Sequence, residues 1–287
     1  MYFKFKNILV KRLVFICVIQ TILVTIFLLS SFATFSQCSI NAGSSQFAFE
    51  AAYPQVFSGE DLSPCRRELA INIHLVANDS LEYEPSLPML NFALSKLNEA
   101  FKRSGISFRY CKIDSIANYK YDYFQVLTEI DEIKTMNYKA GVINLYIVDF
   151  VESAGGFGSM EGHTYFPGGD DIIIIKKEHI TTHVLAHQMG HFLGLYHTHE
   201  MAFGYERVNG TNCTSAGDLL CDTPADTLVS VNLNCIPEET IRDINGDKHH
   251  HPVDNMMSAH INCRCKFTTA QLNKMVYNLM NHRSYLK

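Results

Sequence analysis

Three histidines in the middle of the chain have the spacing of a metal site. His187 and His191 are four residues apart, so on a helix both side chains project from the same face. Gly194 allows the backbone to turn out of that helix, and His197 can then return as a third ligand. Three neutral imidazoles leave one position on a zinc ion open for water or substrate, which is typical of a catalytic site. The alternative is that these histidines lie in a core or on the surface without metal.

The residue after the first histidine departs from the chemistry that such a site needs. In the H-E-x-x-H motif a glutamate at this position acts as general base, but here the position holds Gln188. A glutamine amide has nearly the same shape as a carboxylate, yet it cannot accept the proton. Glu200 is the carboxylate nearest in sequence to the three histidines, but it lies beyond the third one. The sequence therefore predicts a complete set of ligands without its base.

Composition limits the classes of protein that the chain can represent. Of 287 residues, 47% are hydrophobic and 18% are charged, which predicts a folded core and excludes a disordered chain. The net charge is −5 and no basic patch is present, so no nucleic-acid partner is expected.

The N-terminus has the pattern of a targeting segment. Basic residues precede an apolar run over residues 13–32, and small residues follow up to Ser36. This pattern predicts a signal peptide over 1–36 and a secreted, periplasmic or extracellular product that no longer contacts the membrane after cleavage. An uncleaved anchor is the alternative, because the apolar run is long. Residues 37–67 are predicted to be a tail or the remnant of a pro-segment.

Cysteines support an oxidising destination. Nine are present, and eight remain after the predicted cleavage because Cys17 leaves with the signal peptide. An even number in an exported chain indicates disulfides, although spacing alone cannot give their connectivity. The eight are Cys38, Cys65, Cys111, Cys213, Cys221, Cys235, Cys263 and Cys265.

Hydrophobic periodicity predicts alternating strands and helices in the first two thirds of the chain and one more helix near its end. Strands are expected at 69–76, 106–111, 142–151 and 171–175, with a loop over 155–169. Helices are expected at 89–104, around the histidines with Thr182 as N-cap, and from about 268 onward. The inner stripe of the histidine helix is Leu185, Met189 and Phe192. Residues 200–265 lack periodicity, so disulfides are expected to hold them in place.

The histidine segment resembles a known motif. Leu185 to Thr198 is similar to the zinc-binding motif of the metzincin metallopeptidases, and among these to the pappalysin family, which has Glu in place of Gln188. Further similar segments follow in the family's order: Tyr165–Gly168, Cys221–Ala225, Asn255–Met257 and Phe267–Gln271. The resemblance covers about residues 69–280.

The resemblance implies a fold. It predicts an α+β metzincin-like domain over 68–287, with a twisted mixed sheet, an active-site helix and a backing helix in an upper subdomain (68–197). An irregular, disulfide-bonded lower subdomain (198–287) should follow, with a cleft between the two.

The resemblance also implies roles for particular residues. Zinc would be held by His187, His191 and His197, and Met257 would be the methionine of the Met-turn beneath it. The family's crossed disulfides would be Cys213–Cys235 and Cys221–Cys263.

Calcium is a further implication of the resemblance for the lower region. Asp218, Asp222 and Asp226, together with the loop 243–247, supply oxygen atoms there. The alternative is that these residues form solvated turns.

A second departure from the family lies after the Met-turn. The family has a tyrosine two residues beyond the methionine, where its hydroxyl steadies the developing oxyanion, and this chain has Ala259. If Met256 were the methionine, the residue would be Ser258, which is also not a tyrosine.

The chain keeps all three ligands but lacks both the family's glutamate and its tyrosine. This combination predicts a secreted, zinc-binding pappalysin-type homologue. Its proteolysis would be severely impaired or absent, and its cleft would bind a peptide or protein. The alternative is an active zinc endopeptidase with a non-standard general base.

Overall fold

The computed structural model describes residues 65–287, except 79, 81–84 and 153–157. The predicted signal peptide, Cys38 and nearly all of the predicted tail lie outside the described residues. Within them, no helix is both long and apolar enough to cross a membrane.

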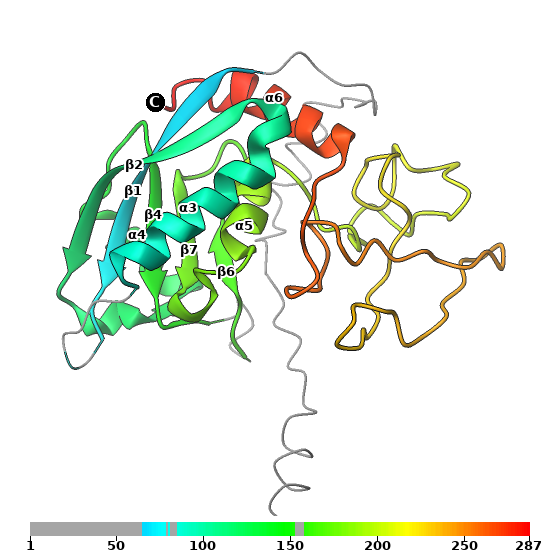
Figure 1. Cartoon of the computed structure of the whole chain (residues 1–287), viewed down its shortest axis with the longest axis horizontal. Coiled ribbons are helices and arrows are strands. Elements are labelled where there is room, and N and C mark those ends of the chain that lie inside the picture. Colours follow the sequence, from blue (N-terminus) through cyan, green and yellow to red (C-terminus); the bar gives the residue numbers. More distant parts are fainter. Residues whose placement is uncertain (1–64, 79, 81–84, 153–157) are drawn as a thin grey trace, which may run out of the picture. The chain divides into compact units, whose positions relative to one another are not determined.

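A five-stranded mixed sheet underlies the part of the structure that is built from helices and strands (Figure 1). Its strands are β1 (Arg67–Val76), β2 (Ile106–Ile116), β4 (Ile143–Val148), β6 (Gly162–Thr164) and β7 (Ile172–Lys176). The strand order is β2-β1-β4-β7-β6, and all neighbours are parallel except β6, which pairs antiparallel with β7 at the edge. Every residue of β4 is buried, as expected for a central parallel strand.

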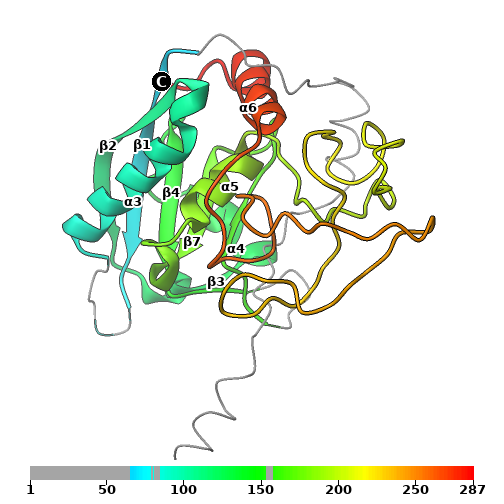
Figure 2. The same ribbon diagram turned by 45° about the vertical axis from the view of Figure 1, so that its right-hand side comes forward.

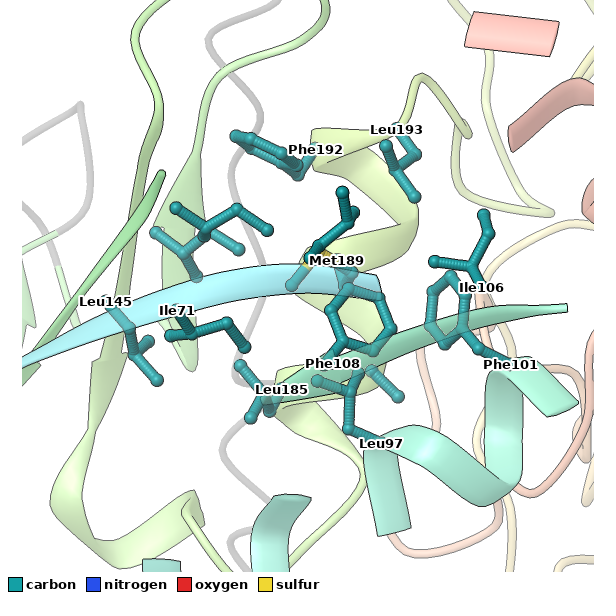
Figure 3. Packing of buried hydrophobic residues seen from close by; sticks show 14 of the residues in the cluster. Ile71, Leu97, Phe101, Ile106, Phe108, Leu145, Leu185, Met189, Phe192 and Leu193 are labelled. Carbon is teal, nitrogen blue, oxygen red and sulfur yellow. The ribbon is translucent and has the colours of Figure 1, made fainter. Parts of the chain in front are cut away.

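Three helices contribute to the core on one face of the sheet. They are α3 (Leu87–Phe101), α5 (Val184–Phe192) and α6 (Thr269–His282). Figure 3 shows side chains of α3 and α5, among them Leu97, Leu185 and Met189, packed together with strand residues such as Ile71. The 3-10 turn Lys102–Ser104 follows α3, and Gly105 ends it with φ 73°. This core fixes where α5 lies on the sheet.

A second, smaller core covers the opposite face. It includes α4 (Val126–Lys134) and the parallel pair β3 (Tyr123–Gln125) and β5 (Phe150–Glu152). Side chains of β7 alternate between the two cores, because successive residues of a strand point to opposite faces.

The predicted elements are confirmed with some differences. The strand expected over 142–151 is divided into β4 and β5, and β6 lies inside the expected glycine-rich loop. Strand β6 has only three residues, too few for periodicity to reveal. The N-cap of α5 is His183 and not Thr182, although the Thr182 hydroxyl accepts a hydrogen bond from the Val184 amide at 3.2 Å.

Residues 193–268, here called the irregular segment, connect α5 to α6 through turns and isolated bridges (Figure 2). No helix or strand element falls in these residues, all of which the structure describes. The predicted fold class is confirmed: a mixed sheet with an active-site helix and a backing helix, followed by an irregular disulfide-bonded part. The exact subdomain boundaries stay a prediction.

The predicted disulfide pairing is wrong for both bonds. The structure joins Cys213 to Cys221, with Cα atoms 5.0 Å apart, and Cys235 to Cys263, with Cα atoms 5.8 Å apart. Consecutive turns between Gly210 and Leu219 bring the first pair together within one short loop. Spacing could not decide this, and the crossed pattern came only from the resemblance. Cys65, Cys111 and Cys265 are thiols.

Candidate metal centre

The three predicted ligands converge on one point. Nε2 of His191 lies 3.1 Å from Nε2 of His187 and 3.1 Å from Nε2 of His197. One ring nitrogen from each member of this histidine triad lies within 4.8 Å of those of the other two. Helix α5 places the first two, and Gly194, with φ 91°, turns the chain so that the third returns to them. Among the described residues, this is the group of side chains with metal-ligand geometry.

Backbone carbonyls orient two of the rings. Nδ1 of His187 lies 2.7 Å from the Met256 oxygen, and Nδ1 of His191 lies 2.7 Å from the Leu195 oxygen. A carbonyl can only accept, so each Nδ1 carries the proton and each Nε2 keeps its lone pair. Hydrogen bonds of this kind commonly fix metal-binding imidazoles.

The triad is neutral at ordinary pH. Burial lowers the pKa of all three imidazoles, that of His191 to about 3. The guanidinium of Arg264 lowers these pKa values further. Three unprotonated imidazoles with converging lone pairs fit a borderline-soft divalent metal such as zinc.

The turn around Met257 lies directly under α5. A Cβ added at Gly190 would lie 2.6 Å from the Met257 sulfur, so glycine is needed there for the two segments to approach. The Met257 oxygen accepts from the Thr198 amide at 3.1 Å, next to His197. This turn therefore contacts both the helix and the loop that carry the triad.

Asp226 connects the loop that carries His197 to His251, a histidine outside the triad. Its carboxylate accepts a hydrogen bond from the Thr198 hydroxyl and lies 2.8 Å from Nδ1 of His251. His249 is also buried, with Nδ1 3.0 Å from the Ala225 oxygen. The sequence alone does not reveal these contacts. A run of three histidines gives no signal for burial.

Gln188 is buried against the edge of the sheet. A Cβ added at Gly162, on β6, would lie 3.2 Å from its amide nitrogen. One residue before β6, Glu161 forms a buried ion pair with Arg264 at 2.6 Å. Arg264 also donates from Nε to the Ser258 oxygen at 2.9 Å. This pair joins the sheet edge to the segment after Met257, and no sequence pattern had indicated it.

The remaining predicted positions offer no substitute chemistry. Ala259 has only a methyl group, and the neighbouring Ser258 hydroxyl donates to the Val253 oxygen at 3.0 Å. The Glu200 carboxylate accepts from the amides of Met201 and Ala202. It therefore caps its own turn, as expected from its place beyond the triad.

A further histidine, His199, lies against the triad two residues after His197. Its ring stacks on that of His197 with centroids 4.8 Å apart, and burial lowers its pKa to about 4.

Comparison with known proteins gives one family. Residues 142–280 match the sequence model of the peptidase M43 family, described as pregnancy-associated plasma protein-A. The chain is 26% identical over 219 residues to an extracellular metalloprotease of Sordaria macrospora, an alignment that covers 68% of each protein.

Two solved metallopeptidase structures are similar over part of the chain. Metalloproteinase-II of Bacteroides fragilis aligns with 15% identity and a TM-score of 0.30, over 61% of this chain and 53% of that one. The chain thus spans about half the length of that structure. Myroilysin aligns with 11% identity and a TM-score of 0.32, over 86% of this chain and 92% of its own.

Proposed function

Because residues 142–280 belong to the pappalysin family of metallopeptidases, we propose that this protein binds zinc through His187, His191 and His197 and engages peptides beside the metal. The observation that carries this proposal is the convergence of three buried Nε2 atoms at 3.1 Å, two of them oriented by backbone carbonyls. When bound, zinc would act as a Lewis acid toward a peptide carbonyl.

Proteolysis is proposed to be severely impaired. The family's base position holds Gln188, whose amide lies against β6 and cannot take a proton from an attacking water. Loss of a general base lowers the rate by about 10²–10⁴-fold. At the family's tyrosine position, Ala259 cannot donate to an oxyanion, and loss of one such donor costs about 10²–10³-fold. The remaining function would be a binding cleft for a peptide or protein.

An active endopeptidase is the alternative. It would need another group to take the proton, and the group of metal-ligand candidates among the described residues contains no carboxylate. The named relative is a metalloprotease, which favours this alternative. The two proposals differ in a measurable rate.

The deciding experiment compares the wild type with Gln188→Glu, alone and combined with Ala259→Tyr, on a mixed peptide library. The proposal expects no cleavage by the wild type, slow cleavage by the single variant and faster cleavage by the double variant. His191→Ala in the double variant is the matched control and should abolish cleavage. Wild-type cleavage at a rate comparable with the repaired variants, stopped by a chelator, would establish the active endopeptidase.

Zinc binding is tested separately from proteolysis. Protein purified without added metal should contain about one zinc per chain, and zinc should raise its melting temperature. Absence of both effects would reject the metal site, whatever the peptide assay shows.

Secretion is proposed from three observations. The N-terminal segment has the signal-peptide pattern, the described residues contain two disulfides, and the Sordaria relative is named extracellular. N-terminal sequencing of protein from a culture medium or periplasm should begin near Gln37. A retained N-terminus in a membrane fraction would favour the anchor.

Calcium binding stays a proposal from the resemblance. Asp218 accepts hydrogen bonds from the Thr223 hydroxyl and the Leu220 amide, and Asp243 accepts from three backbone amides. These carboxylates already serve the irregular segment as acceptors. If calcium also binds there, a calcium chelator should lower the melting temperature of zinc-loaded protein, and added calcium should restore it.

A further inference from the structure

Helix α5 ends at the turn that leads to the third histidine. The last carbonyls of a helix lack partners within it, so other donors must satisfy them when they are buried. Here the helix ends at Phe192, with Leu193 as C-cap, and both residues are fully buried. The placement of His197 therefore depends on what holds these two carbonyls.

The donors come from the C-terminal part of the chain. Nδ2 of Asn278, on α6, donates to the Leu193 oxygen at 2.8 Å. Nε of Arg283, just after α6, donates to the Phe192 oxygen at 3.0 Å. A Cβ added at Gly194 would lie 2.2 Å from the Asn278 nitrogen, so this approach requires the glycine of the motif. A cation at the C-terminal end of a helix is also electrostatically favourable.

The same arginine holds the segment that follows β6. Its Nη2 donates to the oxygens of Tyr165 and Phe166 at 3.1 and 2.9 Å. The Phe166 ring stacks on Tyr196 with centroids 5.0 Å apart and lies 6.1 Å from the His191 ring. One side chain thus contacts both the end of α5 and the segment that packs against the triad.

Arg283 is fixed within this network. Its side chain is fully buried, its guanidinium lies 3.7 Å from the centroid of the Phe192 ring, and Nη1 pairs with Asp171. Tyr285 donates to the same carboxylate at 2.7 Å. A buried cation with a paired carboxylate and three carbonyl acceptors has little freedom to move, and removing it leaves those acceptors unsatisfied.

We propose that Arg283 and Asn278 are positioning residues of the histidine triad, setting metal affinity by fixing the turn between His191 and His197. This inference rests on the proposed zinc binding. The C-terminal helix then belongs to the metal centre, although it supplies no ligand. We expect their removal to change metal affinity within the range of about 10–100-fold that is typical of residues that hydrogen-bond the ligands directly.

The experiment measures zinc affinity by competition with a chelating dye for Arg283→Met, Asn278→Ala and the control Arg67→Met. Arg67 holds the same C-terminal segment, through the oxygens of Ser284 and Leu286, but its hydrogen bonds do not go to α5. The zinc Kd should rise about 10–100-fold in Arg283→Met. It should change by less than about twofold in the control, and Arg283→Lys should fall between. The absorption of bound cobalt should change in the same order.

A second measurement needs no metal. In metal-free protein, Arg283→Met should accelerate hydrogen exchange of the amides of Gly194 and Leu195 more than Arg67→Met does. Wild-type affinity and wild-type exchange in both Asn278→Ala and Arg283→Met would overturn the inference. If Arg283→Met does not fold, Asn278→Ala alone decides it. If the wild type binds no zinc, the proposed function fails, and the exchange measurement decides the positioning role.

Discussion

The first two histidines and the third are held by different kinds of structure. His187 and His191 lie on α5, whose inner side chains Leu185 and Met189 are buried in the main core. His197 lies in the irregular segment, where hydrogen bonds, two disulfides and a few buried side chains take the place of regular elements. Hydrophobic burial therefore places one half of the metal site, while polar contacts from distant parts of the chain place the other.

The helix that carries His187 and His191 and the loop that carries His197 differ in how many contacts from other parts of the chain they need. Helix α5 is placed mainly by the burial of its apolar face against the sheet, and Arg283 satisfies the carbonyl of its last residue, Phe192. The loop after it depends on Asp226, the Met257 turn and the C-terminal residues Asn278 and Arg283, which lie in three separate segments of the sequence. A site built this way can lose a catalytic residue and still keep its ligands, because different contacts support each of them.

The largest effect on stability is expected in α5, the helix that carries His187 and His191. Leu185→Ala removes a side chain that is 2% exposed in the main core and should cost about 2–5 kcal/mol of unfolding free energy. Denaturant unfolding measures this. Leu87→Ala, on a side chain that is 56% exposed, is the control and should cost about 0.5 kcal/mol or less. Equal costs would contradict the claim that burial holds this helix.

The disulfides should give the next largest effect, confined to the irregular segment. In the chain-entropy model, removing Cys235–Cys263, which spans 28 residues, costs about 3.5 kcal/mol. Removing Cys213–Cys221, which spans 8 residues, costs about 2.5 kcal/mol. Each pair is replaced by two serines and compared by thermal melting under oxidising conditions. Peptide mapping of the unreduced protein tests the pairing itself, and recovery of a Cys213–Cys235 peptide would contradict it.

Ionisation of Glu206, in the irregular segment, is expected to lower the free energy of unfolding as the pH rises. Burial, and to a smaller extent the nearby Asp226, raise the pKa of this carboxyl to about 7. A raised pKa in the folded state gives stability that is fully present below about pH 4.5 and lost as the pH rises past about 7. Glu206→Gln, which stays neutral, should therefore be more stable than the wild type at pH 8 by about 1–3 kcal/mol and equal to it near pH 4.

The measurement for Glu206 is denaturant unfolding at both pH values in the presence of a chelator. Glu200→Gln is the control, because that carboxylate lies at the surface and accepts from two amides. A Glu206→Gln variant that gains no stability at pH 8 would show that another group compensates the buried charge.

The sequence predicted α5, with His187 and His191, better than it predicted the contacts of the irregular segment that carries His197, and the reason is physical. Apolar periodicity is local, so the stripe of Leu185, Met189 and Phe192 could be read from one segment. The spacing of the three histidines likewise predicted that their side chains meet at one point. Contacts such as Arg283 with Phe192 join residues 91 positions apart. No local pattern encodes such a contact. The disulfide pairing failed for the same reason, since it depends on turns whose geometry the spacing of cysteines does not show.

The smallest effect concerns Asp222, where the irregular segment contacts the start of α6. The family resemblance implied a calcium ligand here, and the carboxylate of Asp222 accepts from the Thr268 hydroxyl at 2.8 Å and the Ala270 amide at 2.7 Å. It thus supports the N-terminus of α6, where Thr268 and Gln271 form a capping box. Asp222→Ala should lower the unfolding free energy by about 1 kcal/mol, and Asp222→Asn by less, because its amide oxygen can still accept. Denaturant unfolding with and without calcium separates the two roles. A cap gives the same loss in both conditions, whereas a calcium ligand gives a loss that appears only when calcium is present.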